Sequence, residues 1–411
     1  MSELRWHPLL GEWVVTATHR QDRTFLPPAD YCPLCPTQIG GFPSEIPAAN
    51  YDIVTFENKF PSYRPEPPVP AVEGDELHPV APAAGVCEVL VYSPNHNTTL
   101  AQESLGQIYK LVRVWTHRFR ELGQLEFVDY VFIFENKGEA IGVTLHHPHG
   151  QIYAFPYVPP RVARELETAR AHQARTGRCL VCDVVADERA DGRRLVAEND
   201  DFTAVIPFFA RYPYEVHLYA RRHMQALTDL TDGEQRALAA LLKTVLVKYD
   251  NLFGFSLPYM MVLHQRPSDG ADYSYYHFHI EFYPPLRTPT KLKYLAGVES
   301  GAGTFINDTL AEEKAEELRR AEPQTPYGWQ AADEGAISDF RFQISDFRSQ
   351  ISNFESEISN HQGTVLPGGP LQRLARGARR PAGPGNNRHR RRQGRRRRQP
   401  ATLRPVRRVY V

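Results

Sequence analysis

The pattern of hydrophobic and polar residues predicts the same order of secondary-structure elements twice along residues 1–325. The first copy predicts a strand, a helix and a strand, at residues 89–92, 105–122 and 130–134. The second copy reads the same way, at residues 216–219, 231–245 and 277–283. Apolar residues three and four apart indicate an amphipathic helix, whereas short continuous or alternating apolar runs indicate strands. Thr231 and Glu234 form a capping-box pattern at the start of the second helix. We therefore predict two α+β halves, each a sheet with one long helix.

Cysteine and histidine positions repeat in the same order. Each half begins with a C-x-x-C pair, Cys32/Cys35 and Cys179/Cys182. Two histidines follow in each half, and their separation is 51 positions from His96 to His147 and 54 positions from His223 to His277. We therefore expect a duplicated chain with halves at residues 1–166 and 167–325.

The formal net charge of zero conceals two regions of opposite charge. The chain has 48 Lys and Arg against 48 Asp and Glu, but residues 361–411 hold 15 arginines, no lysine and no acidic residue. Residues 1–360 therefore carry a net charge of −15. Hydrophobic residues at 42% are enough for a large core, which excludes a disordered body. An acidic folded body thus precedes a basic tail.

The sequence lacks the marks of a membrane or secreted protein. It contains no run of 18 apolar residues, and its N-terminus has no apolar signal-peptide core. Four of the five cysteines form the C-x-x-C pairs, which in a reducing cytosol more often hold a metal than a disulfide. We therefore expect a cytoplasmic protein with no membrane partner.

The string His147-Pro148-His149-Gly150-Gln151 concentrates the candidate chemistry. On a strand, His147 and His149 share a face about 6–7 Å apart, so one can bind a metal while the other faces a substrate. A neutral imidazole is a good nucleophile toward phosphorus, because its pKa is ~6.5. Gly150 would let the backbone approach a phosphate closely. A bare H-x-H is more often an ordinary pair of half-buried histidines, but the whole string after a C-x-x-C pair favours a functional site.

With this string, the sequence resembles the galactose-1-phosphate uridylyltransferase family, a duplicated branch of the histidine-triad superfamily. The similarity covers roughly residues 4–320 and includes segments 32–35, 93–96, 134–138, 147–151, 248–253, 277–279 and 282–286. The resemblance implies an α+β fold of two histidine-triad-like halves, each an antiparallel sheet with a long helix.

The resemblance also implies a two-step, ping-pong exchange. His149 would attack the α-phosphorus of UDP-glucose, expel glucose 1-phosphate and hold UMP covalently until galactose 1-phosphate collects it. Both sugar phosphates are low-pKa leaving groups, so positioning and charge stabilisation can supply most of the barrier reduction. Gln151 stands where histidine-triad hydrolases have a third histidine. An amide can donate to a phosphoryl oxygen but is a poor proton shuttle, which favours sugar-phosphate acceptors over water.

Further residues match the substrate contacts of the family. The matching residues of the first half are Arg20, Arg23, Asn58, Lys59, Asn136, Gly142, Val143 and Thr144, with Gln151 again. Arginine is the expected phosphate partner, although a solvated surface pair has the same spacing. A segment that in the family reaches across a dimer interface to the sugar phosphate matches Lys293, Tyr294 and Glu299. Val298 and Phe305 depart from the family pattern there, but the resemblance still implies a homodimer.

One metal set is unambiguous in the resemblance, and a second is not. The first is Cys32, Cys35, His96 and His147, a closed Cys₂His₂ set that predicts a structural zinc supporting the strand of His149. The second site has two alternatives. The internal repeat gives Cys179, Cys182, His223 and His277, whereas family members with a second metal give Glu165, His264, His277 and His279. His277 cannot easily serve both, and paired thiolates favour zinc in the cysteine set. A reduced cysteine pair without metal is a third possibility.

The resemblance ends after residue 320. Ile and Phe positions three and four apart over 337–358 suggest a short coiled coil within residues 326–360, or equally a low-complexity segment. The arginine-rich residues 361–411 are predicted to be disordered. The tail has the charge to bind nucleic acid, but no aromatic residues interleave its arginines, which favours an accidental extension.

We therefore predict a nucleotidyltransferase of galactose metabolism that acts on UDP-glucose and a hexose 1-phosphate, without a nucleic-acid partner. Two alternatives remain from the sequence. One is a nucleotide-sugar phosphorylase or adenylyltransferase of the same superfamily. The other is a zinc-stabilised nucleic-acid-binding protein that acts through the basic tail.

Overall fold

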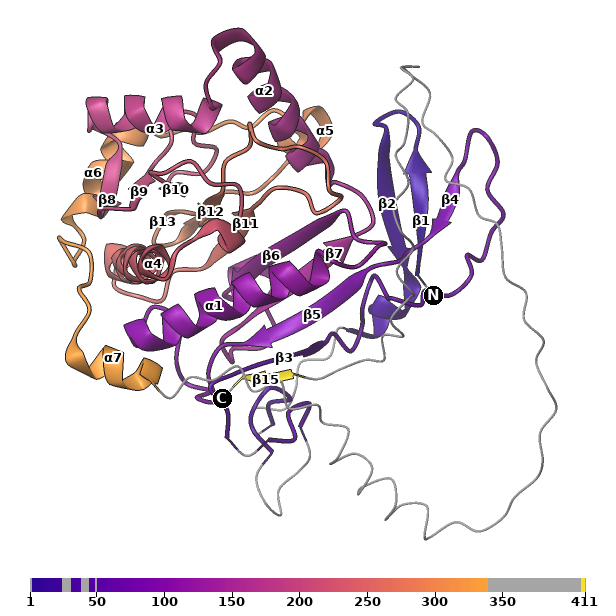
Figure 1. The fold of residues 1–411 in the computed structure, drawn as a ribbon, viewed down its shortest axis with the longest axis horizontal. Helices are drawn as coiled ribbons and strands as arrows, with labels where there is room; N and C mark the ends of the chain where they lie inside the picture. The colour runs from indigo at the N-terminus through magenta and orange to yellow at the C-terminus, as the bar shows by residue number, and fades with distance from the viewer. Residues whose placement is uncertain (1, 24–30, 38–43, 49, 339–407, 411) are drawn as a thin grey trace. The chain divides into compact units, whose positions relative to one another are not determined.

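A single ten-stranded sheet dominates the computed structural model (Figure 1), which describes residues 2–23, 31–37, 44–48, 50–338 and 408–410. Its strand order among these residues is β15-β3-β5-β7-β6-β11-β12-β10-β9-β8, and neighbouring strands are antiparallel. The strands are β3 (Ile53–Glu57), β5 (Val86–Val91), β6 (Tyr130–Lys137), β7 (His149–Phe155), β8 (Leu195–Glu198), β9 (Phe202–Val205), β10 (Val216–Ala220), β11 (Tyr259–His264), β12 (His279–Tyr283) and β15 (Arg408–Tyr410).

The two repeats share this sheet. Strand β6 of the first repeat pairs with β11 of the second, with Lys137 opposite Tyr259 and Ile133 opposite Leu263. The α+β class and the antiparallel pairing are confirmed, and the sheets of the two halves join through this pair of strands. Both joining strands bury alternate residues, so their pairing removes two exposed sheet edges at once.

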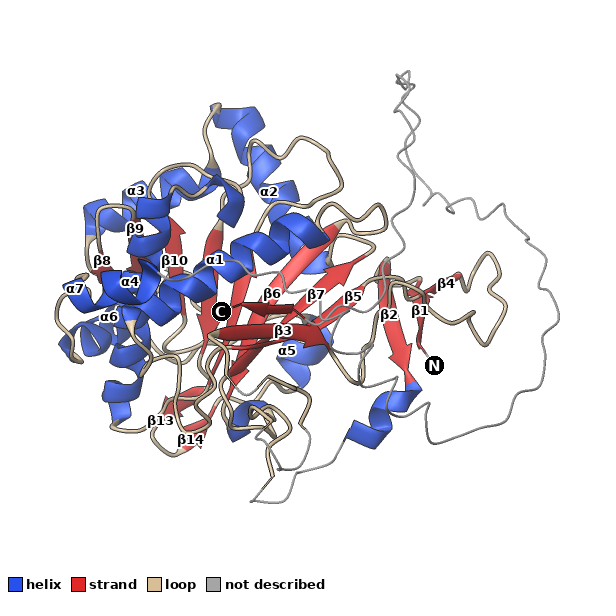
Figure 2. Cartoon of the chain, turned by 60° about the horizontal axis from the view of Figure 1, so that its bottom comes forward, coloured by secondary structure: helices blue, strands red, loops and turns tan. Residues whose placement is uncertain are grey.

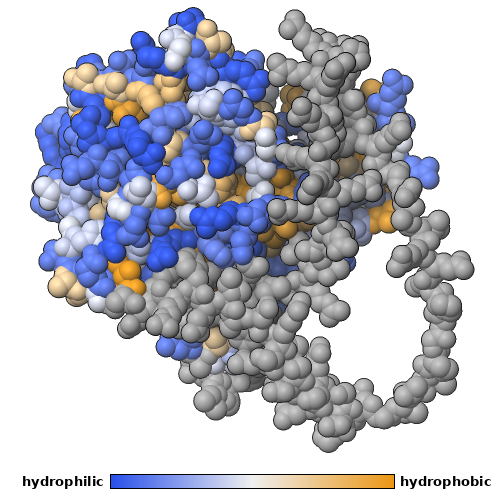
Figure 3. Space-filling model, viewed as in Figure 1, coloured by the Kyte–Doolittle hydropathy of each residue, from blue (hydrophilic) through white to orange (hydrophobic). Residues whose placement is uncertain are grey.

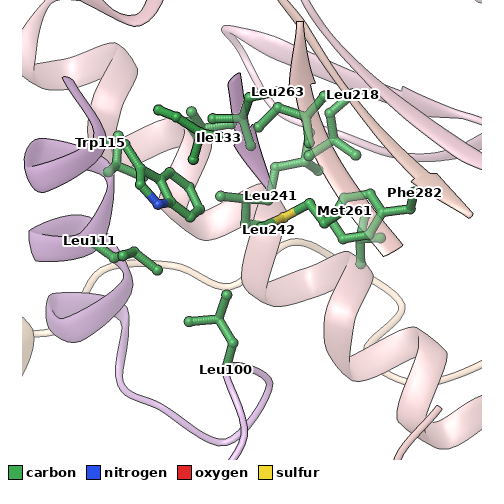
Figure 4. Packing of buried hydrophobic residues seen from close by; sticks show 14 of the residues in the cluster. Leu100, Leu111, Trp115, Ile133, Leu218, Leu241, Leu242, Met261, Leu263 and Phe282 are labelled. Atoms are coloured by element: carbon green, nitrogen blue, oxygen red, sulfur yellow. The ribbon is translucent and has the colours of Figure 1, made fainter. Parts of the chain in front are cut away.

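Two long helices cover one face of the sheet and pack against each other. They are α1 (Leu105–Leu122) and α4 (Asp232–Phe253), one from each repeat (Figure 2). Leu111 and Trp115 of α1 and Leu241 and Leu242 of α4 point toward strand residues such as Ile133 (Figure 4). One hydrophobic core therefore spans both repeats, and it lies between the helices and this face of the sheet.

The helix starts follow the expected capping chemistry. Ser104 accepts a hydrogen bond from the Gln107 amide at 3.1 Å and caps α1. At α4, the Glu234 amide donates to the Thr231 hydroxyl oxygen at 3.2 Å, and the Thr231 amide donates to the Glu234 carboxylate at 2.8 Å. The capping box predicted at Thr231 and Glu234 is confirmed.

The remaining elements surround the main sheet. A small sheet has the order β2-β1-β4, and β13 pairs with β14. These strands are β1 (Ser2–His7), β2 (Glu12–Ala17), β4 (Val80–Pro82), β13 (Leu286–Thr288) and β14 (Lys291–Leu292). The other helices are α2 (Pro160–Thr176), α3 (Leu180–Asp191), α5 (Gly297–Ala302), α6 (Ala311–Arg320), α7 (Ala331–Ser338) and the 3₁₀ helices η1 (Thr18–Arg23), η2 (Glu139–Ile141) and η3 (Leu227–Asp229). Figure 3 shows that the visible surface of the body is largely hydrophilic. Within the described residues, no helix has the length and apolar character needed to cross a membrane.

The C-terminal predictions are only partly within the described residues. Ile337, the first position of the heptad-like pattern, lies in α7 and packs against the main core. The later positions of that pattern, and most of the arginine-rich tail, lie outside the described residues. Arg408–Tyr410 form β15 at the edge of the sheet beside β3, which differs from the disorder expected there. An edge strand offers unpaired backbone groups, and Val and Tyr favour extended structure.

Candidate active site

Strand β7 presents a row of polar side chains on the face of the sheet opposite α1. Ile152 and Ala154 are buried in the core beneath α1, whereas His149, Gln151 and Tyr153 are partly exposed. Successive side chains on a strand point to opposite faces. His149, Gln151 and Tyr153 therefore share the open face.

A backbone carbonyl defines the protonation of the His149 ring. Its Nδ1 lies 2.8 Å from the carbonyl oxygen of His147. A carbonyl only accepts hydrogen bonds, so Nδ1 carries the proton and the lone pair of the neutral ring is on Nε2. The same hydrogen bond strengthens when the ring becomes cationic. His149 thus has a nucleophilic nitrogen of defined identity.

Asn58 orients the amide of Gln151. Its Nδ2 donates to the Gln151 Oε1 at 3.3 Å, and its Oδ1 accepts from the Phe60 amide at 2.9 Å. With its oxygen engaged, Gln151 directs its NH₂ group to other acceptors, such as a phosphoryl oxygen. The neighbouring Lys59 is exposed and forms an ion pair of 3.3 Å with Glu45.

Arg20 is held at the same face by two hydroxyl groups. Its Nη1 donates to the Ser62 hydroxyl at 2.5 Å and to the Tyr153 hydroxyl at 3.1 Å. Tyr153 follows His149 by four residues on the same face of β7. A guanidinium has five N–H donors, so further donors remain for a phosphate. Arg23 ends η1, but its side chain lies outside the described residues.

The matched nucleotide-contacting residues lie on β6 and in the loop that leads to β7. Asn136 is partly exposed on β6, the strand that pairs with β7. Gly142 follows η2 with a φ of 81°, in the left-handed region that favours glycine. Val143 and Thr144 continue this loop, and Thr144 is exposed. The structure therefore brings these residues toward the strand that carries His149.

The segment after β14 is arranged differently. Lys293 is 5% exposed, and its ammonium group is 3.3 Å from the Glu299 carboxylate and also contacts the Ile306 carbonyl. Lys293 and Glu299 are thus paired within their own segment. Tyr294 is 73% exposed.

Two cysteines and two histidines meet beside the start of β7. The ligand atoms that lie within 4.8 Å of one another belong to Cys32, Cys35, His96 and His147. The Cys35 sulfur is 3.5 Å from the Nδ1 of each histidine. The Nε2 of His147 donates to the Ser93 carbonyl at 2.8 Å, so its Nδ1 lone pair faces the sulfurs.

The protonation chemistry of this first cluster fits a metal ion. Burial lowers the pKa of His147 to about 4, so its ring is neutral at pH 7 and able to act as a ligand. Burial and the neighbouring Cys32 raise the pKa of the Cys35 thiol to about 12. Cys35 therefore stays a thiol at pH 7 unless a cation binds beside its sulfur.

The second repeat contains the same arrangement. The Cys182 sulfur is 3.7 Å from the His223 Nδ1 and 3.5 Å from the His277 Nδ1, and the Cys179 sulfur is 3.7 Å from the His277 Nδ1. The Nε2 of His277 donates to a backbone carbonyl at 2.9 Å, as the Nε2 of His147 does. Of the two sequence alternatives, His277 therefore lies with the cysteines.

The other alternative forms a separate cluster, with Glu281 where His277 was expected. The ligand atoms within 4.8 Å of one another belong to Glu165, His264, His279 and Glu281. The His264 Nδ1 is 2.9 Å from the Glu165 Oε2. Burial opposes ionisation of Glu165, but the pairing with His264 lowers its pKa to about 2. This set also offers oxygen and nitrogen ligands to a metal.

The two repeats differ at the position of the nucleophile. The His279 Nδ1 donates to the His277 carbonyl at 2.9 Å, the counterpart of the His149 contact with His147. His279 is only 6% exposed, and its Nε2 is 3.5 Å from the Glu281 carboxylate. The ring at this position is thus partly exposed in the first repeat and buried beside a carboxylate in the second.

Comparison with known proteins agrees with this duplicated site. Residues 1–159 match the galactose-1-phosphate uridyl transferase N-terminal domain, and residues 165–331 match its C-terminal domain. The chain belongs to this family. It is 44% identical over 325 residues to the galactose-1-phosphate uridylyltransferase of Thermotoga maritima, over 78% of this chain and 99% of that protein. It is 36% identical over 330 residues to the protein of that name from Haemophilus influenzae, over 77% and 93%.

Solved structures show the same fold. A structure described as a uridylyltransferase superposes with a TM-score of 0.69 at 37% identity, over 77% of this chain and 97% of that chain. An ADP-glucose phosphorylase from Arabidopsis thaliana superposes with a TM-score of 0.59 at 24% identity, over 79% and 99%, and that likeness shows the fold alone. The resemblance inferred from the sequence to the galactose-1-phosphate uridylyltransferase family is confirmed.

Sequence reasoning missed three contributors to the site. Tyr153 and Ser62 hold Arg20, and only Tyr153 had a sequence signal, its even spacing from His149 on one strand. Glu281 had a similar signal, two residues after His279. The structure also gives a reason for Gly150 that the sequence did not indicate, because a Cβ there would lie 2.1 Å from the Tyr92 hydroxyl oxygen.

Proposed function

We propose that the chain is a UDP-glucose–hexose-1-phosphate uridylyltransferase of galactose metabolism. The observation that carries this proposal is the His149 ring, whose Nδ1 donates to the His147 carbonyl and whose lone pair is therefore on Nε2. The ring shares its face of β7 with Gln151 and with Tyr153, which binds Arg20. The names of the relatives supply the substrates, and the site has the groups to act on them.

The reaction proceeds in two displacements at phosphorus. The Nε2 lone pair of His149 attacks the α-phosphorus of UDP-glucose, an N–P bond forms, and the P–O bond to glucose 1-phosphate breaks. Glucose 1-phosphate leaves with that electron pair. A phosphate oxygen of galactose 1-phosphate then attacks the same phosphorus, UDP-galactose forms, and the N–P electron pair returns to Nε2. The Nδ1 proton stays on the ring throughout, held by the His147 carbonyl, so no proton shuttle is needed.

The neighbouring residues bind and orient the substrates in this proposal. The Gln151 amide donates to a non-bridging oxygen, where negative charge grows in the transition state. Arg20, with Arg23, binds phosphate oxygens. Asn58 and Lys59 contact the uridine, and the loop of Asn136, Gly142, Val143 and Thr144 follows the nucleotide phosphates. The acidic body makes such local cations necessary, because its net charge repels anionic substrates.

We further propose that both Cys₂His₂ clusters hold zinc. Paired thiolates with two imidazoles form the closed tetrahedral set of structural zinc, which supplies rigidity rather than an open catalytic position. In the first repeat this rigidity would fix His147 and hence the carbonyl that binds His149. The cluster of Glu165, His264, His279 and Glu281 is a candidate for a third metal of the kind that oxygen and nitrogen ligands select.

A cytoplasmic homodimer is part of the same proposal. The segment after β14 exposes large apolar side chains, at Tyr294, Leu295, Val298, Ile306 and Leu310. Such clustered exposure is typical of a protein interface. Of Lys293, Tyr294 and Glu299, Tyr294 is then the residue available to the sugar phosphate of a partner subunit. Light scattering that gives the mass of one chain would reject the dimer.

The two matched family domains support a division of the chain into halves near residues 1–166 and 167–325.

Intact mass spectrometry tests the function. The protein mixed with UDP-glucose should gain the mass of one uridylyl group, and His149→Gly should gain none. His146→Gly is the matched control, because His146 is three residues away, has a side chain 68% exposed, and pairs only weakly with Glu139 at 3.6 Å. An adenylyl adduct formed from ADP-glucose, with none from UDP-glucose, would instead establish the phosphorylase alternative.

Truncation tests the nucleic-acid alternative. Deletion of residues 346–411 spares Ile337 and its core contacts, and of the described residues it removes only the edge strand β15. We expect the truncated protein to retain uridylyl transfer. Loss of transfer together with loss of nucleic-acid binding would favour the alternative.

A further inference from the structure

The space beneath Gly150 is occupied by a tyrosine hydroxyl. Gly150 lies between His149 and Gln151 on β7, and its missing side chain would point to the core side of the sheet. A Cβ at this position would lie 2.1 Å from the Tyr92 hydroxyl oxygen and 3.0 Å from the Phe134 carbonyl oxygen. Tyr92 therefore fits under β7 only because residue 150 has no side chain.

The Tyr92 side chain cannot swing away from this position. It is 1% exposed and packs edge-on against Trp115 of α1, with ring centroids 6.5 Å apart. Its own backbone amide donates to the Pro148 carbonyl at 3.1 Å, and its carbonyl accepts from the Gln107 side chain at 2.7 Å. Tyr92 thus contacts the His147–Gln151 string at two points. Its backbone binds Pro148, and its hydroxyl lies beneath Gly150.

The buried Glu135 carboxyl group lies near Tyr92 and is bound by another tyrosine. Burial and the adjacent Glu135 raise the pKa of the Tyr92 phenol well above its ordinary value. The Tyr259 hydroxyl donates to the Glu135 Oε1 at 3.2 Å. Burial also raises the pKa of Glu135 to about 7, against the opposing effect of Lys137, which itself pairs with Asp250 at 3.0 Å. The phenol therefore remains protonated near neutral pH.

We propose that Tyr92 is a positioning residue for uridylyl transfer. The Tyr92 hydroxyl, fixed by the packing of its ring against Trp115, supports the backbone of Gly150 and so fixes His149 and Gln151 on the opposite face of β7. This proposal rests on the function proposed above. It also implies that residue 150 must be glycine because residue 92 is tyrosine.

The rate should be sensitive to this support, because the two reacting-face residues flank Gly150 directly. A displacement of about 1 Å at a catalytic group can lower a rate by about 100-fold. An added methyl at residue 150 must displace either the strand or the tyrosine, and the tyrosine is confined by its burial and by Trp115. The strand is the part that moves, and His149 and Gln151 move with it.

A double-mutant cycle tests the proposal. Adduct formation from UDP-glucose is followed in a single turnover for the wild type, Gly150→Ala, Tyr92→Phe and the double variant. We expect Gly150→Ala to react about 10- to 100-fold more slowly with little change in the UDP-glucose concentration dependence. Removing the hydroxyl in the double variant should recover at least about threefold, and only partly because the Phe134 carbonyl remains close. Thermal melting confirms that each variant is folded at the assay temperature.

Tyr259→Phe provides the matched control. It removes a different buried hydroxyl, the one that donates to Glu135, but leaves the space beneath Gly150 filled, so Tyr259→Phe should not rescue Gly150→Ala. Equal rescue by both phenylalanine variants, or a double variant as slow as the product of the two single effects, would overturn the proposal. A wild type that forms no adduct would overturn both this proposal and the function, whereas an adduct without rescue overturns only this one.

Tyr92→Phe alone gives a second arm that does not depend on Gly150→Ala folding. It keeps the ring against Trp115 but removes the hydroxyl beneath Gly150, and it should lower the adduct rate by about threefold or more. A wild-type rate in Tyr92→Phe would contradict a positioning role of the hydroxyl.

Discussion

The first metal cluster is connected to the nucleophile through His147, which makes ligand replacement an informative perturbation. The Cys35 sulfur is 3.5 Å from the His147 Nδ1, and the His147 carbonyl accepts from the His149 Nδ1 at 2.8 Å. Cys35→Ser removes one thiolate, weakens metal binding and frees the His147 ring to move. We expect slower formation of the uridylyl adduct.

The size of the effect follows from one hydrogen bond. A hydrogen bond to a charged group contributes about 1.5–3 kcal/mol, and the His149 ring becomes cationic as the N–P bond forms. Loss of this bond in the transition state corresponds to roughly a 10- to 150-fold lower rate. Measured losses for groups that orient metal or catalytic ligands fall in the range of about 10- to 100-fold. Substrate affinity should change less than the rate, because the bond is strongest after the ring is charged.

Metal analysis combined with single-turnover kinetics measures this effect. Cys182→Ser, in the matching cluster of the second repeat, is the control. Each variant should lose about one metal ion per chain, but Cys35→Ser alone should slow adduct formation in the range given above. Equal slowing by the two variants would refute the reasoning, as would an unchanged rate in a Cys35→Ser protein that has lost its metal.

Three further outcomes follow from named contacts. Asn58→Ala removes the donor that orients Gln151 at 3.3 Å, and kcat should fall roughly three- to tenfold in steady-state assays; an unchanged kcat would show that Gln151 is oriented otherwise. The Arg222 guanidinium, 2.7 Å away, lowers the pKa of Glu234 to about 2, so this carboxylate stabilises the fold above about pH 4.5 and the contribution is lost as the pH falls toward 2. Because Arg222 is half-exposed, solvent screens this ion pair, and we expect Glu234→Gln to lower the unfolding free energy, measured in urea at pH 7, by about 1–2 kcal/mol. This loss should become smaller below pH 4, and a loss that does not change with pH would contradict the predicted pH dependence. Lys248 is 1% exposed and donates to carbonyl groups at the end of α6, including that of Ala321 at 2.8 Å. Lys248→Met should therefore lower the unfolding free energy by about 2–3 kcal/mol, and an unchanged urea midpoint would contradict this role.

The duplicated fold could be predicted because it is encoded locally. Helical periodicity around Trp115 and the capping box at Thr231 and Glu234 depend on residues a few positions apart, and both appear in the structure. The pairing of β6 with β11 could not be predicted, because it joins strands more than a hundred residues apart. Nothing in the alternation of Ile133 or Leu263 distinguishes an edge strand from one at the centre of a larger sheet.

The site shows the same division. The clusters could be identified from the His147–Gln151 string and from both cysteine pairs, because C-x-x-C pairs with histidines farther along the chain are typical of metal sites. The sequence did not identify partners that come from distant loops, such as Ser62, which binds Arg20. Burial was equally hidden: Lys293 reads as an exposed cation, but its segment folds over it and pairs it with Glu299.

The atom of His149 that carries the uridylyl group tests the central claim most directly. Protein labelled with ¹⁵N at histidine and reacted with UDP-glucose can be examined by ³¹P–¹⁵N correlation NMR after unfolding. The hydrogen bond from Nδ1 to the His147 carbonyl predicts a single phosphorus–nitrogen coupling, to Nε2 of one histidine, which is absent in His149→Gly. A coupling to Nδ1, or one that persists without His149, would contradict the account.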